Sequence, residues 1–108
     1  MSQIDDLVQQ EKANILAETA KAPWKELERF YAQGKLILVC DGLDLVEVAY
    51  EFSTDNTDKT QQWIDSGKLL RDFNKQANEF VQSDAKLWCV VIKPWILIQH
   101  DKSHVLKE

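Results

Sequence analysis

Residues 87–99, LWCVVIKPWILIQ, decide the fold. Residues 87–92 are mostly branched or aromatic and read as a strand that is apolar on both faces, and residues 95–99 read as a second strand. Lys93 and Pro94 separate the two, because proline has no N–H to donate to a sheet. The run is also too short for a membrane helix, so it belongs to a core.

The last strand is apolar on both sides. Its side chains alternate, with Trp95 and Leu97 on one side and both isoleucines on the other, so each face needs a cover. Pro94 cannot donate a backbone hydrogen bond, and we therefore expect this strand near a sheet edge, where a second protomer can pair. Trp95 is accordingly predicted to face a partner or a ligand.

Upstream, periodicity predicts one more strand and several helices. Residues 35–40, KLILVC, are bounded by Asp41 and Gly42 and read as a buried strand and a turn. Apolar residues recur at helical spacing behind a capping residue or proline in four stretches. These run from Ser2 to about Thr19 (with Ile4, Leu7, Val8 and Ile15 on one face), from Pro23 to Gly34, from a cap at Asp55, Asn56 or Thr57 to Gly67, and onward from Asp72. Residues 20–22 read as a tight corner.

Residues 43–52, LDLVEVAYEF, fit two templates. Their apolar side chains recur at helical spacing behind Asp44, a suitable N-cap, yet they also alternate from Val46 onward as in a strand. The glutamates and the alanine are better helix formers, which favours a helix over residues 44–52. The alternative is a strand that forms a hairpin with residues 35–40.

Together these segments predict an α+β domain in which four to five helices pack on one small, mostly antiparallel sheet. The strands lie near residues 35–40, 87–92 and 95–99. Residues 1–100 are expected to form one globular domain, followed by a polar tail at 101–108. A chain of 108 residues, 44% of them hydrophobic, buries a sufficient core without a disulfide or a metal.

The charge balance disfavours several partners. Thirteen Lys and Arg against 18 Asp and Glu give a net charge of −5, which repels nucleic acid and anionic membranes. The N-terminal residues do not read as a secretory signal, so a cytoplasmic protein is expected. In that reducing compartment Cys40 and Cys89, which lie in apolar runs without a Cys-x-x-Cys motif, are expected to be buried free thiols.

No set of residues forms a recognisable catalytic or metal site. The acidic residues between Asp41 and Glu51 read as a solvated helix face. His100 and His104 have the spacing of a helical metal pair but lack further ligands, and they read as part of a polar tail. Glycine-rich phosphate motifs are absent from the sequence. We therefore expect no catalytic residue, no metal and no cofactor.

Two classes of function remain. The favoured one is a non-catalytic protein-interaction or self-associating module, such as a homo-oligomer, anchored by Trp95. The alternative is a small-ligand-binding protein or a hydrolase with a pocket between the sheet and residues 44–52. That pocket would use Glu47 together with Lys93 or Gln99.

Four phrases also resemble one protein family. They are PWKELERFYAQG (23–34), LDLVEVAYEF (43–52), the stretch from Trp63-Ile64 to Gly67-Lys68-Leu69, and KPWILIQ (93–99). In combination they are similar to the bacterial domain of unknown function 2288 family, over about residues 13–100. The resemblance implies a bacterial origin and a single-domain build. It assigns no activity, ligand or residue role.

Overall fold

The computed structural model describes residues 3–100, which contain five helices and five strands joined by turns and loops. The helices are α1 (Gln3–Glu18), α2 (Trp24–Ala32), α3 (Leu45–Ser53), α4 (Thr57–Asp65) and α5 (Asn74–Ser83). The strands are β1 (Ala20–Pro23), β2 (Leu36–Val39), β3 (Leu69–Leu70), β4 (Lys86–Ile92) and β5 (Trp95–His100). The α+β class is confirmed. Over these residues no helix is both long and apolar enough to cross a membrane. The predicted tail at 101–108 lies outside the described residues.

The strands form one sheet in the order β1-β4-β5-β2-β3. β4 and β5 form an antiparallel hairpin, β1 and β3 pair antiparallel at the two edges, and only β2 and β5 run parallel. The mostly antiparallel sheet is thus confirmed, but the prediction that β5 lies near an edge is wrong. Pro94 sits in the hairpin turn, outside the ladder, so its missing N–H costs the sheet no hydrogen bond.

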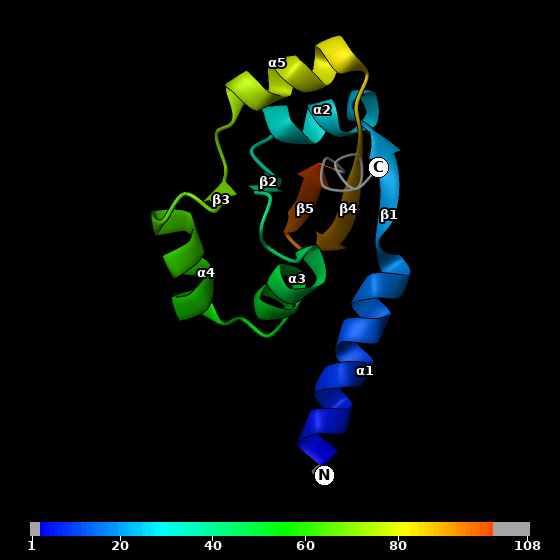
Figure 1. Cartoon of the computed structure of the whole chain (residues 1–108), viewed down its shortest axis with the longest axis vertical. Coiled ribbons are helices and arrows are strands. Elements are labelled where there is room, and N and C mark those ends of the chain that lie inside the picture. Colours follow the sequence, from blue (N-terminus) through cyan, green and yellow to red (C-terminus); the bar gives the residue numbers. More distant parts are fainter. Residues whose placement is uncertain (1–2, 101–108) are drawn as a thin grey trace.

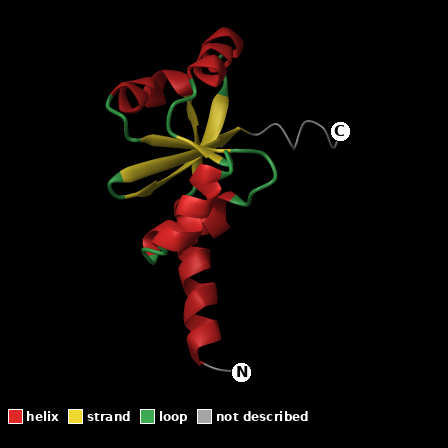
Figure 2. Cartoon of the chain, turned by 90° about the vertical axis from the view of Figure 1, so that its left-hand side faces the viewer, coloured by secondary structure: helices red, strands yellow, loops and turns green. Residues whose placement is uncertain are grey.

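Helices cover both faces of the sheet, which lies between two helical layers in Figure 2. On one face, α2 and α5 bury Trp24 and Phe80 against Ile98 of β5. On the other, α1 and α3 bury Ile15 and Val48 against Leu97, with α4 packed beside them. The alternation of β5 is confirmed, and helices of the same chain cover both of its faces.

Residues 20–22, expected as a corner, instead form most of edge strand β1. Alanine and lysine are weak strand formers, so pairing with β4 rather than local preference makes this a strand. Lys21 also lies over the ring of Trp88, its neighbour on β4, at 5.0 Å. Pro23 ends the strand and precedes α2, which begins one residue later than predicted.

The ambiguous residues 43–52 contain a helix, as favoured. The carboxylate of Asp44 accepts a hydrogen bond from the N–H of Val46 at 2.9 Å and caps α3. In α1, by contrast, the predicted apolar face is not buried as a whole, since Ile15 is 3% exposed but Leu7 is 64% exposed. The reason is visible in Figure 1, where α1 projects away from the sheet and only its last turns reach the body. The expected cap at Ser2 lies outside the described residues.

Candidate functional site

The four predicted site residues are spread over the fold. Trp95 begins β5, Lys93 lies in the turn before it, and Gln99 lies near the other end of the strand, about 13 Å from Trp95 at the usual strand rise. Glu47, on α3, is bound to Lys12 of α1 at 3.1 Å. These side chains therefore do not converge on one pocket.

Gln99 has a structural task. Its side-chain amide donates to the backbone carbonyls of Cys40 and Leu43, at 3.2 and 2.6 Å, and so ties the loop after β2 to β5. Gln99 also lines a hollow of about 500 Å3 between α1, the start of α3 and Trp88, which we call the Trp88 hollow. Neither Glu47 nor Lys93 lines it.

Trp95 is half-buried beside the α3 layer. The guanidinium of Arg71 lies over its ring, 4.6 Å from the centroid, so a cation of the same chain covers part of the indole. A role for Trp95 in meeting a partner stays a prediction.

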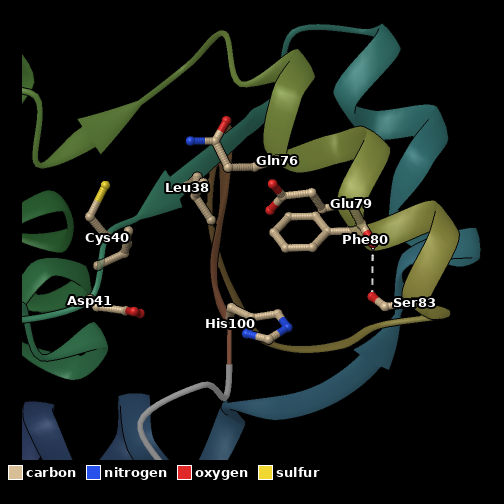
Figure 3. Close-up of a pocket in the computed structure, with 9 residues that line it drawn as sticks. Leu38, Cys40, Asp41, Gln76, Glu79, Phe80, Ser83 and His100 are labelled. Atoms are coloured by element: carbon tan, nitrogen blue, oxygen red, sulfur yellow. Dashed lines mark hydrogen bonds between the residues drawn. The ribbon is translucent and has the colours of Figure 1, made fainter.

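A second hollow, of about 450 Å3, lies on the opposite face of the sheet, under α5 (Figure 3). We call it the His100 hollow. Leu38 and Phe80 supply apolar surface, and polar side chains surround it on several sides. These polar residues are Cys40, Asp41, Gln76, Glu79, Ser83 and His100.

The fold brings these residues together in two ways. β2 and β5 are parallel, with Leu38 aligned on Ile98, so the loop after β2 and the end of β5 meet at the same edge of the sheet. Ligands in sheets with parallel strands commonly bind outside the carboxyl ends of those strands. The wall above is one face of α5, where Gln76, Glu79 or Phe80, and Ser83 recur at helical spacing.

His100 is the side chain that the sequence interpretation placed wrongly. It is the last residue of strand β5 rather than part of a tail. The imidazole stacks on Phe80, with centroids 5.5 Å apart and planes 6° from parallel. Its Nδ1 atom is shielded from solvent and has no hydrogen-bond partner among the described residues. His104 lies outside those residues.

The two cysteines are free, as predicted, but half-buried rather than buried. Burial raises the pKa of Cys40, and the neighbouring Asp41 carboxylate raises it further. The Cys40 thiol donates to the carbonyl of Gly67 at 3.5 Å. Burial, with a contribution from Glu26, also raises the pKa of Cys89. Both effects oppose thiolate formation, so the arrangement suits binding rather than thiol catalysis.

Within residues 3–100, no three His, Cys, Asp or Glu side chains lie close enough together to hold a metal ion. The His100 hollow is therefore a set of separate polar groups around an apolar floor. Such a set resembles the lining of small-molecule sites, in which a few polar groups orient a ligand held mainly by apolar contact.

Sequence reasoning missed this hollow. The signal was present in part, because Gln76, Glu79 and Ser83 form a polar stripe on α5 beside the apolar Phe80. What the stripe faces depends on the parallel pairing of β2 with β5, which no local pattern indicates.

Comparison with known proteins agrees with the fold. The model of a family described as "Protein of unknown function (DUF2288)" matches residues 10–100. A solved structure, the NMR solution structure of PA1075 from Pseudomonas aeruginosa, is 37% identical, with a TM-score of 0.73. The match covers 88% of this chain and 85% of that one. No curated protein matches. The chain therefore belongs to the DUF2288 family of proteins of unknown function.

Proposed function

We propose that this protein binds a small organic molecule in the His100 hollow. The observation that carries the proposal is a hollow of about 450 Å3 in which the apolar side chains of Leu38 and Phe80 are surrounded by polar groups, His100 among them. The volume lies within the usual range for small-molecule sites.

The surroundings of His100 support binding over catalysis. Its ring is fixed by stacking on Phe80, which is 5% exposed, so the imidazole is held in one orientation. A nucleophile activated by this imidazole is not evident, because the Cys40 thiol donates elsewhere and its pKa is raised. The proposal thus keeps the small-ligand-binding alternative of the sequence analysis. It places the ligand in the His100 hollow instead of a pocket between the sheet and residues 44–52.

Nuclear magnetic resonance with a fragment library tests the proposal. Binding fragments are expected to shift the backbone signals of Asp41, Glu79 and His100 together. Ser83→Phe places a ring in the hollow and is expected to abolish those shifts, whereas Gln82→Phe, at a neighbouring exposed position that does not line it, leaves them intact. Shifts that survive Ser83→Phe, or that map elsewhere, would refute the proposal.

A second candidate function is self-association, the class favoured from sequence. It is supported by the exposed apolar side chains of the projecting α1, where Leu7 is 64% and Leu16 is 62% exposed. Leu16 also borders the largely apolar Trp88 hollow, so exposed apolar surface continues from α1 onto the body. Sedimentation velocity over a range of concentrations tests it. A mass that rises toward a dimer supports association, and a constant monomer mass rejects it.

A further inference from the structure

The His100 hollow carries negative charge on two sides. Asp41 approaches it from the loop after β2, and Glu79 points toward it from α5 (Figure 3). No lysine or arginine lines the hollow, and within residues 3–100 neither carboxylate forms a salt bridge. Both carboxylates are exposed and therefore partly screened by solvent, but an anionic ligand would still meet two like charges there, while a cationic ligand would be attracted.

The hydrogen-bonding groups match a ligand that donates. Both carboxylates accept hydrogen bonds only. An ammonium group has three donors and no acceptor, so it can serve several of these groups at once.

The rest of the lining suits hydrocarbon. Leu38 of β2 and Phe80 of α5 are each 5% exposed and give the hollow apolar surface on two sides, and the imidazole of His100 stacks on Phe80. A ligand with an apolar or aromatic body would bury that body here and leave its charged end toward the carboxylates.

Resting on the proposed function, we propose that the His100 hollow selects a small organic amine. The protonated amino group lies beside the carboxylates of Asp41 and Glu79, and the apolar body lies on Leu38 and Phe80. Carboxylates and phosphates of similar size are rejected. The site thus distinguishes its ligands first by charge and then by the size of their apolar part.

Three probes of matched size test the selection: 2-phenylethylamine, 2-phenylethanol and 3-phenylpropionate. Each is titrated into the full chain and followed by the amide signals of Asp41, Glu79 and His100. The amine is expected to bind about tenfold more tightly than the alcohol, and the carboxylate more weakly than both. Such a tenfold preference corresponds to about 1.4 kcal/mol.

Two charge-neutralising variants locate the effect. Asp41→Asn and Glu79→Gln are each expected to weaken the amine about fivefold and to leave the alcohol unchanged. Glu28→Gln, an exposed carboxylate of α2 outside the hollow, is the matched control and should change neither affinity.

The outcomes separate this inference from the proposed function. If the alcohol or the carboxylate binds as well as the amine while the same signals shift, selection for amines is refuted and the hollow remains a ligand site. If the two variants leave amine affinity unchanged, the inference fails as well. If none of the probes shifts these signals, the amine inference is overturned, and the fragment screen with Ser83→Phe decides the proposed function alone.

Discussion

Both thiols are held in their neutral form by their surroundings. Burial raises the pKa of Cys40 and of Cys89, with smaller contributions from Asp41 and Glu26 respectively. Because the thiolate is the reactive species, we expect the native protein to react with Ellman's reagent more slowly than free cysteine at about pH 8. Unfolded protein should yield both thiols at once. Immediate labelling of one thiol in the native protein would contradict this expectation.

The same shifts give the free energy of unfolding a pH dependence. Thiols of the unfolded chain ionise near their ordinary pKa of 9.0, below the native values, so this part of the stability is lost as pH rises through that range. Urea unfolding at about pH 8 and about pH 10 should therefore show a larger loss in the wild type than in the Cys40→Ser/Cys89→Ser double variant. Equal losses would mean that the thiols titrate alike in both states.

Gln99 braces the loop that carries Asp41. Its amide donates to the carbonyls of Cys40 and Leu43, and Gln99→Ala removes both hydrogen bonds. We expect the free energy of unfolding to fall by about 1–2 kcal/mol in urea titrations. Gln82→Ala, at an exposed position of α5, is the control and should change it by less than about 0.5 kcal/mol. A similar result for the two variants would show that the brace contributes nothing.

At the scale of elements, the start of α3 depends on one side chain. The Asp44 carboxylate accepts from the N–H of Val46 at 2.9 Å, and Asp44→Ala leaves that N–H to water. The expected loss in urea unfolding is about 1 kcal/mol. Asp44→Asn keeps an oxygen in the same place and should retain most of the stability. If asparagine costs as much as alanine, the negative charge rather than the cap stabilises the helix start.

Local patterns predicted the elements that form for local reasons. The cap at Asp44 and the helix formers behind it indicated α3, and the branched run of residues 87–92 indicated β4. β1 was missed because its Ala-Lys-Ala-Pro sequence has little strand preference and is a strand only through pairing with β4. The central position of β5 was missed because Pro94 was taken as a sign of an edge strand. Pro94 lies in the turn before β5 and takes no part in its pairing.

At the scale of the whole molecule, the His100 hollow could not be predicted from the same patterns. Asp41, Glu79 and His100 are far apart in the chain and meet only because β5 enters the sheet parallel to β2, beneath α5. Charge and polarity along the sequence indicated solvated helix faces and a tail. Tertiary pairing turns those same side chains toward one space, so the candidate site is a property of the topology and not of a motif.

The projecting α1 carries the last prediction. Leu16 is 62% exposed, so Leu16→Gln should leave urea unfolding within about 0.5 kcal/mol of the wild type. If α1 mediates self-association, the same variant should raise the dimer dissociation constant at least about fivefold in sedimentation, because truncated apolar anchors weaken interfaces more than folds. Val81→Gln, 55% exposed on α5 in the opposite helical layer, is the matched control and should leave association unchanged. If both variants weaken association equally, the association is unspecific apolar contact, and α1 is not its interface.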